Sequence, residues 1–114
     1  MITLDLGRGV TFRIFPESRY CETVYPDGYR MGATREPTST NLREAHEQGY
    51  TGADACWHSL LEHEVTHTFA ARLMFGRESL VLRYECGAED VPYGLRLLEE
   101  GAVLTWQMKR NGQL

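Results

Sequence analysis

The sequence has few cysteines and no long apolar run. Cys21, Cys56 and Cys86 are far apart and odd in number, and no C-x-x-C pair occurs, so reduced thiols are expected rather than a disulfide framework. No apolar stretch approaches the length of a membrane span. The first residues lack a basic stretch followed by an apolar one, so no signal peptide is expected. These absences favour a cytoplasmic protein.

A strong charge of either sign is also absent. The formal net charge is −4 and no basic block occurs, which argues against nucleic acid as a partner. The 114 residues, 42% hydrophobic and 25% charged, suffice for one ordinary globular domain but not for two. We therefore expect a single domain over residues 1–114 that acts on neither nucleic acid nor membranes. The sequence does not indicate an oligomeric state.

The sequence does contain the pattern H-E-x-x-H, from His63 through His67. On a helix, residues i and i+4 lie one above the other on one face, so the two imidazoles can reach a single Zn²⁺. Glu64 points to one side of that line, where it is poorly placed as a ligand but well placed to take a proton from water on the metal. The residue types also fit, because imidazole suits zinc and a carboxylate beside a cation stays ionised.

The residues around the motif favour a metal site over two alternatives, which are core histidines satisfied without a metal and a chance match on a surface helix. On a helical wheel the two histidines share an arc with Leu60, Ala70, Ala71 and Met74. A solvated face would carry charges there. Unpaired imidazoles on an apolar arc cost desolvation free energy, and a bound metal removes that cost.

The first forty residues are expected to be rich in β-structure. Runs that favour strands alternate with turn signals, of which Gly7-Arg8-Gly9 suits a hairpin and Pro26-Asp27-Gly28 suits a tight turn. The Pro/Ser/Thr-rich stretch Glu36–Thr40 predicts a loop. The predicted strands are Ile2–Leu6, Val10–Phe15, Tyr20–Tyr25 and Tyr29–Ala33.

The remainder of the chain is expected to be mainly helical. Asn41 and Asp54 are the expected N-caps of the first two helices, and Gly76 is expected to end the second. The segment Ser79–Glu85 is too short for periodicity to distinguish a strand from a helix. Strands followed by helices predict an α+β fold, β-rich over residues 1–40 and with metal-binding helices over 54–110. The predicted helices are Asn41–Gln48, Ala55–Phe75 and Pro92–Lys109.

The third metal ligand must come from outside the motif, because catalytic zinc usually takes three protein ligands and leaves a fourth position for water. His67 is the last histidine in the chain. His46 and His58 are less favoured, since His58 lies off the metal face of the same helix and a surface position suffices for His46. Glu99 and Glu100 of the last predicted helix are better candidates. The apolar stripe of that helix passes over Glu99, so amphipathicity favours Glu99 as the buried one.

The motif followed by a helix that carries glutamate resembles the gluzincin family of zinc metallopeptidases, in which the third ligand is a Glu on a second helix. In that family the ligand Glu is often followed by a small residue, and Glu100-Gly101-Ala102 matches this pattern. The stretch Cys56–Gln107 also resembles short uncharacterised zincin-like proteins of phages and prophages. The resemblance implies a minimal zincin-like domain, a host cytoplasm and Glu100 as third ligand, whereas amphipathicity favours Glu99.

We therefore expect a zinc-dependent peptidase that hydrolyses peptide bonds through a metal-activated water, with Glu64 as general base. A peptide substrate is expected to extend along an edge strand, either Val10–Phe15 or Ser79–Glu85. A donor to the oxyanion is also needed. The candidates for this donor are Tyr93, Tyr84, Arg83 and Arg96.

Two other functions remain open. One is a catalytically weak or inactive zincin-like protein, in which zinc stabilises the fold and the β-rich half binds a partner protein. The other is an interaction domain without a metal. The short chain leaves little surface for a deep cleft, which favours a binding role. Glu64 favours an enzyme, because a purely structural zinc site needs no base.

Overall fold

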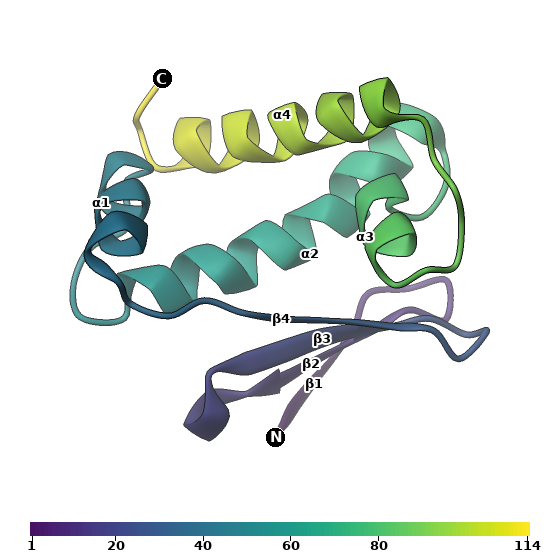
Figure 1. The fold of residues 1–114 in the computed structure, drawn as a ribbon, viewed down its shortest axis with the longest axis horizontal. Helices are drawn as coiled ribbons and strands as arrows, with labels where there is room; N and C mark the ends of the chain where they lie inside the picture. Colours follow the sequence, from purple (N-terminus) through teal and green to yellow (C-terminus); the bar gives the residue numbers. More distant parts are fainter.

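The computed structural model describes residues 1–114 and has three layers: an antiparallel sheet, a central helical layer and an outer helix (Figure 1). The strands are β1 (Ile2–Asp5), β2 (Thr11–Phe15), β3 (Tyr20–Val24) and β4 (Arg30–Thr34). The helices are α1 (Ser39–Glu47), α2 (Ala55–Phe75), α3 (Leu80–Glu85) and α4 (Tyr93–Arg110), and Pro16–Ser18 forms a 3₁₀ turn. The predicted α+β class is confirmed, with strands first and helices second.

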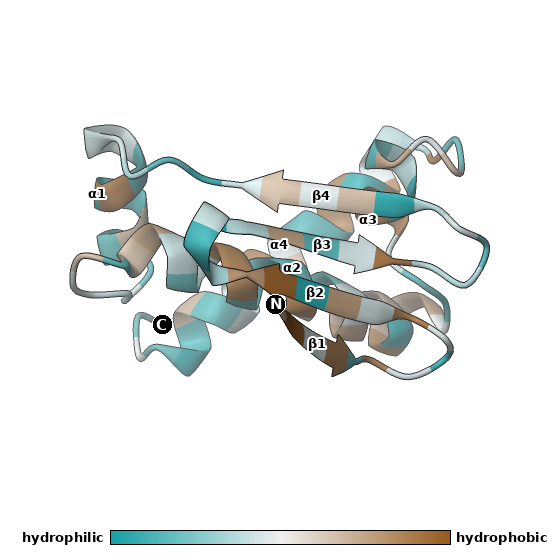
Figure 2. Cartoon of the chain, turned by 90° about the horizontal axis from the view of Figure 1, so that it is seen from below, coloured by the Kyte–Doolittle hydropathy of each residue, from teal (hydrophilic) through white to brown (hydrophobic).

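The sheet is a meander in the order β1-β2-β3-β4, with every neighbouring pair antiparallel. The predicted hairpin turn is present, and Gly7, Arg8 and Gly9 have φ values of 79°, 55° and 75°. Glycine adopts such values without steric cost, which explains why two of the three positions are glycine. Figure 2 shows β1 and β4 at the two edges of the sheet.

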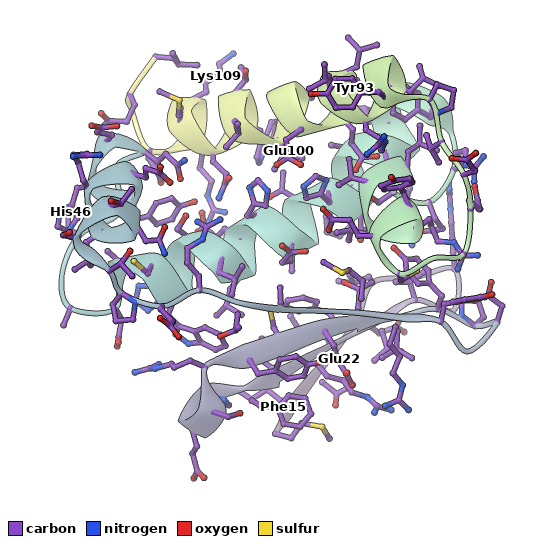
Figure 3. All side chains as sticks on the ribbon, in the orientation of Figure 1. Phe15, Glu22, His46, Tyr93, Glu100 and Lys109 are labelled. Atoms are coloured by element: carbon purple, nitrogen blue, oxygen red, sulfur yellow. The ribbon has the colours of Figure 1, made fainter.

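Side chains of the sheet alternate between a face that packs on the helices and a face that points away from them. Phe12 and Cys21 belong to the main core cluster, together with Trp57 and Leu60 of α2. Phe15 and Glu22 lie on the side of the sheet that faces away from the helices (Figure 3). Burying a large apolar side chain stabilises the fold by about 1.5–3 kcal/mol, so this cluster holds α2 across the sheet.

Helix α2 begins and ends at the predicted residues. Gly76 has a φ of 67°, and its N–H donates to the carbonyl of Arg72, as is common where a helix ends at glycine. The predicted capping role of Asp54 is wrong, because its side chain makes no cap hydrogen bond and pairs with Arg19 at 2.9 Å instead. The helix boundary therefore does not depend on a carboxylate cap.

Helix α1 begins earlier than predicted. It starts at Ser39 rather than after Asn41, because the hydroxyl of Thr38 accepts a hydrogen bond from the N–H of Asn41 and acts as the N-cap. Residues 39 and 40, predicted to lie in a loop, are therefore helical. The side chain of Asn41 donates to the carbonyl of Glu36 instead. A second core cluster joins α1 to the start of α2 through Ala45, Tyr50, Ala55 and Cys56.

The ambiguous segment after α2 is helical. The hydroxyl of Ser79 accepts from the N–H of Leu82 and caps α3. Helix α4 lies one residue later than predicted and runs antiparallel to α2 in the outer layer (Figure 1). Its buried residues, Glu99, Val103 and Gln107, bring two polar side chains against α2.

None of the helices combines the length and the apolar character that a bilayer crossing requires. All three cysteines are unpaired, with Cys21 and Cys56 buried and Cys86 partly buried. The free thiols agree with the expectation from their spacing.

Candidate metal centre

Three of the predicted site residues meet between α2 and α4. His63 and His67 project from α2, and Glu100 faces them from α4, where Figure 3 shows it between the two helices. The Nε2 atoms of the two histidines are 3.1 Å apart. The Glu100 carboxylate has one oxygen 2.6 Å from Nε2 of His63 and the other 3.2 Å from Nε2 of His67. The three candidate ligand atoms lie within 4.8 Å of one another, close enough to share one ion.

Glu99 is fully buried, as amphipathicity predicts, but its oxygens are used elsewhere. Nδ1 of His67 donates to Oε2 of Glu99 at 2.6 Å, and the hydroxyl of Ser79 donates to the same oxygen. The backbone N–H of Leu80 donates to Oε1 at 2.7 Å. Glu99 thus orients the ring of His67 from behind, and Glu100 is the carboxylate that faces the Nε2 atoms.

Gln107 orients His63 in the same way. Nδ1 of His63 lies 2.8 Å from Oε1 of Gln107. The amide nitrogen of Gln107 donates to the carbonyl of Ser59 at 3.1 Å and to the hydroxyl of Tyr50 at 2.8 Å. A carbonyl only accepts, so the amide nitrogen must face Ser59 and the amide oxygen must face His63. The Tyr50 hydroxyl in turn donates to Glu62 at 2.6 Å, which extends the network along α2.

These partners determine which nitrogen of each imidazole carries a proton. Because Nδ1 of each ring donates to an oxygen, the neutral rings present lone pairs at Nε2. In neutral rings, two lone pairs and a carboxylate then face one another, which is unfavourable unless a proton or a metal cation lies between them. Two imidazole nitrogens and one carboxylate oxygen suit Zn²⁺ and leave its fourth position open to water.

The electrostatics of the cluster show the same requirement for positive charge. Burial alone lowers the pKa of His67, but hydrogen bonds to Glu100 and Glu99 outweigh it and raise the pKa to about 9. Burial acts to raise the pKa of Glu100, yet hydrogen bonds from the two histidines hold it well below its usual range. A metal must displace the proton that His67 would otherwise hold, so binding releases a proton.

Glu64 is 8% exposed and has no hydrogen-bond or ion-pair partner among the protein side chains. It follows His63 directly, so it lies about 100° around α2 from that ligand. Burial raises the pKa of Glu64, and the positive charges of His67 and His63 only partly offset this rise. A buried, unpartnered carboxylate beside the ligands has the properties of a proton acceptor.

A further carboxylate, Glu85, interacts with the charge of Glu100 and with that of Arg96, which stacks on two tyrosines. Partial burial and the charge of Glu100 raise the pKa of Glu85 at the end of α3. The guanidinium of Arg96 lies 3.6 Å from the ring centre of Tyr84 and 5.3 Å from that of Tyr93. The Glu100 side chain keeps 37% of its surface exposed, so the centre is open to solvent.

Of the four predicted oxyanion donors, Tyr84, Tyr93 and Arg96 lie together, and Arg83 lies apart from them. Arg83 belongs to a different ion-pair cluster, because its guanidinium pairs with Asp27 at 2.7 Å and with Glu89 at 3.5 Å. Tyr93, the first residue of α4 (labelled in Figure 3), is 64% exposed, and the guanidinium of Arg96 lies 5.3 Å from its ring centre. Tyr93 as oxyanion donor therefore stays a prediction.

The two less favoured histidines lie on the surface. His58 is an exposed residue of α2, and His46 is an exposed residue of α1, away from Glu100 (Figure 3). The expected substrate strands are wrong in both cases. The strand predicted over Val10–Phe15 is β2, which lies between β1 and β3, and Ser79–Glu85 is a capped helix. The open edges of the sheet belong to β1 and β4 instead.

Sequence reasoning missed the residues that support the ligands from behind. Gln107 was the one residue with a detectable signal in the sequence. It follows Glu99 and Val103 at intervals of four, so these residues form a buried stripe on α4 with a polar side chain at each end. Tyr50 and Ser79 had no such signal. They come from other elements and reach the centre only through the packing of the chain.

Comparisons with protein-family models, with curated protein sequences and with solved structures found no match. The resemblance to gluzincins therefore rests on the motif and the residues that follow it.

Proposed function

We propose that the protein is a zinc-dependent peptidase with His63, His67 and Glu100 as metal ligands. One observation supports the proposal most directly: Nε2 of His63, Nε2 of His67 and the Glu100 carboxylate converge on one point. Glu99 and Gln107 accept hydrogen bonds from the Nδ1 atoms, which leaves the Nε2 atoms free to bind a metal. Structural zinc sites almost always have four protein ligands, whereas three leave a position for water. Zinc bound there would supply Lewis acidity, polarising a peptide carbonyl and lowering the pKa of water.

Glu64 supports hydrolysis rather than a structural role for the metal. Its carboxylate is buried next to the ligands and has no protein partner to compete for it. In the proposed reaction Glu64 accepts a proton from the attacking water and returns it to the leaving amine.

The free edge of β4 supports a peptide as the substrate. β4 pairs only with β3, and it packs beside both α2, which carries the histidines, and α3. An extended peptide can join such an edge through backbone hydrogen bonds, in a manner that depends little on its sequence. β4 therefore replaces the two segments expected earlier as the strand that would align a substrate.

The alternative is a zinc-stabilised binding protein with little or no turnover. The larger surface hollows are lined by residues other than the metal ligands, which favours a partner that binds elsewhere on the surface. In this case the metal contributes folding free energy and the β-rich half binds a protein. A cytoplasmic location is proposed for either function, on the cysteine usage alone.

Metal analysis combined with a peptidase assay tests the proposal. We expect one zinc per chain in the wild type and in Glu64→Gln, and loss of zinc in His63→Ala and Glu100→Ala. Hydrolysis of a mixed fluorogenic peptide library is expected from the wild type and from His46→Ala, with Glu64→Gln lower by about 10²–10⁴-fold. His46→Ala is the matched control, because His46 is an exposed histidine on another helix.

The outcomes distinguish the two functions. Zinc retained in Glu100→Ala would contradict the ligand assignment, and equal hydrolysis by the wild type and Glu64→Gln would contradict the role of the base. Full zinc occupancy without hydrolysis of any peptide would favour the zinc-stabilised binding protein.

A further inference from the structure

The side of the α2–α4 pair that faces away from Glu64 is apolar and exposed. On a helical wheel of α2, Glu64 lies on one side of the two histidines, and Phe69 and Leu73 lie on the other. A groove of about 260 Å³ runs between the helices on that side, and six of the seven residues that line it are hydrophobic. The residues of this apolar face are Phe69, Ala70, Leu73, Leu98, Ala102 and Trp106.

We propose that the apolar face binds a second copy of the same chain across a twofold axis. A twofold contact brings each surface against itself, so a charged patch would meet its own charge. None of the seven residues that line the groove is charged, although the chain as a whole has a net charge of −4, and Lys109 lines the adjoining hollow on α4. Two copies can therefore meet at the groove without like-charge repulsion.

The shape of the apolar face also suits a contact with itself. Leu73 protrudes, with 88% of its surface exposed, while the small residues Ala70 and Ala102 line the groove beside it. A twofold contact needs both the protruding group and its recess on one surface, because each copy supplies both. Leu73 of one copy can enter the groove of the other, in the manner of ridges packing into grooves between helices.

The exposed area is close to what a dimer requires. At roughly 200 Å² for a fully exposed large apolar residue, the exposed fractions of the large side chains on the face and in the groove sum to on the order of 600 Å² per copy. A standard interface buries about 800 Å² per partner, and an apolar patch of about 600 Å² is at the upper end of those found on monomers. The side chains included are Phe69, Leu73, Met74, Leu98 and Trp106.

Dimerisation through this face is compatible with an accessible metal centre. Glu64 and Glu100 lie on the opposite side of the contact between α2 and α4, and Glu85 and β4 lie on that side as well. A second copy on the apolar face leaves this opening free. The proposed dimer is therefore independent of the metal, and the two proposals can fail separately.

Measurement of the solution mass across a wide concentration range tests the proposal. By sedimentation equilibrium, the wild type is expected to have about twice the chain mass of 13.0 kDa, and Leu73→Glu is expected to have the chain mass. Leu73 is almost fully exposed, so the variant should keep the wild-type circular dichroism and zinc content. Leu114→Glu is the matched control, because Leu114 is 72% exposed and lies outside the face; it should remain dimeric.

A second variant keeps the test decisive if Leu73→Glu misfolds. Leu73→Cys is expected to form a disulfide-linked dimer on mild oxidation, since the twofold axis brings the two copies of position 73 into the same contact. A wild type that stays at 13.0 kDa overturns the proposal, including the case in which the face binds vesicles or a foreign peptide instead. A dimeric Leu73→Glu, or a monomeric Leu114→Glu, overturns it as well.

Discussion

The two sides of the α2–α4 pair differ in how their side chains are held. On the side of the candidate metal centre, called the metal side below, both histidines have a hydrogen-bonded partner, and those partners are themselves bonded to Ser79, Leu80, Ser59 or Tyr50. On the apolar side Phe69, Leu73 and Trp106 are 51%, 88% and 59% exposed and lie beside an open groove. The same two helices thus present one ordered polar surface and one apolar surface that lacks a partner.

The difference shows what each kind of burial does. A buried polar group left without a partner costs about 1–3 kcal/mol, so the polar network admits few alternative arrangements and defines the positions of the ligands. Apolar contacts are not directional, so the apolar face stabilises the protein only once another surface covers it. The metal side determines geometry, and the apolar side offers binding free energy.

The largest effect is expected from His67→Ala, which removes a fully buried member of the polar network. The change strands the Glu99 carboxylate in the interior without its imidazole partner, and removing one partner of such a buried pair costs about 3–5 kcal/mol. Urea unfolding should show this loss even in the presence of a chelator, and zinc analysis should show loss of the metal. His46→Ala should change neither quantity, because His46 is exposed.

A chelator provides the complementary measurement on the wild type. Zinc bound only by the folded chain stabilises it, so chelation should lower the melting temperature of the wild type but not that of His67→Ala. A wild-type melting temperature that is the same with and without the chelator would show that no metal contributes to stability.

An intermediate effect is expected when the support behind His63 is removed. Gln107→Leu frees Nδ1 of His63, so the ring is no longer held with its lone pair on Nε2, and zinc affinity should fall by about 10–100-fold. Tyr50→Phe should have a smaller effect, because Gln107 keeps its bond to the carbonyl of Ser59. Competition with a chromophoric chelator measures the zinc affinity of each variant. An equal loss of zinc affinity in Gln107→Leu and Tyr50→Phe would contradict the more direct role of Gln107 in orienting His63.

The smallest effect concerns Cys21, which lies on the sheet beneath the metal side. Burial, and then the charge of Glu64, raise the pKa of Cys21 to about 12. The thiol should therefore stay protonated and resist iodoacetamide at mildly alkaline pH, while the partly exposed Cys86 reacts first. Mass spectrometry of the labelled protein locates each adduct.

The sign of this pH dependence follows from the direction of the shift. Because the folded-state pKa lies above the unfolded value of about 8.5, the neutral thiol favours folding below that value, and the contribution is lost as the pH rises toward 12. Glu64→Gln removes a nearby negative charge and should bring the Cys21 pKa down slightly. Rapid labelling of native Cys21 would contradict its placement in the core.

Much of the fold follows from local signals in the sequence. Helix α2 could be predicted to the residue, because Gly76 ends it by a backbone conformation that other residues adopt at a cost. The strands could be predicted within a residue at each end, because alternating apolar residues and turn glycines act over short distances. The start of α1 could not be predicted in this way, since Thr38 and Asn41 are both good caps and the sequence does not rank them.

The sequence by itself determined the pair of histidines, the glutamate between them and the α+β order, because each depends on spacing within one helix or along neighbouring strands. Tertiary structure alone decided which of two adjacent glutamates faces the histidines. Glu99 and Glu100 point about 100° apart on α4, so the rotation of that helix against α2 turns one behind His67 and the other toward both Nε2 atoms. That rotation is set by packing across the whole helix contact, to which residues distant in the sequence, such as Tyr50 and Ser79, contribute.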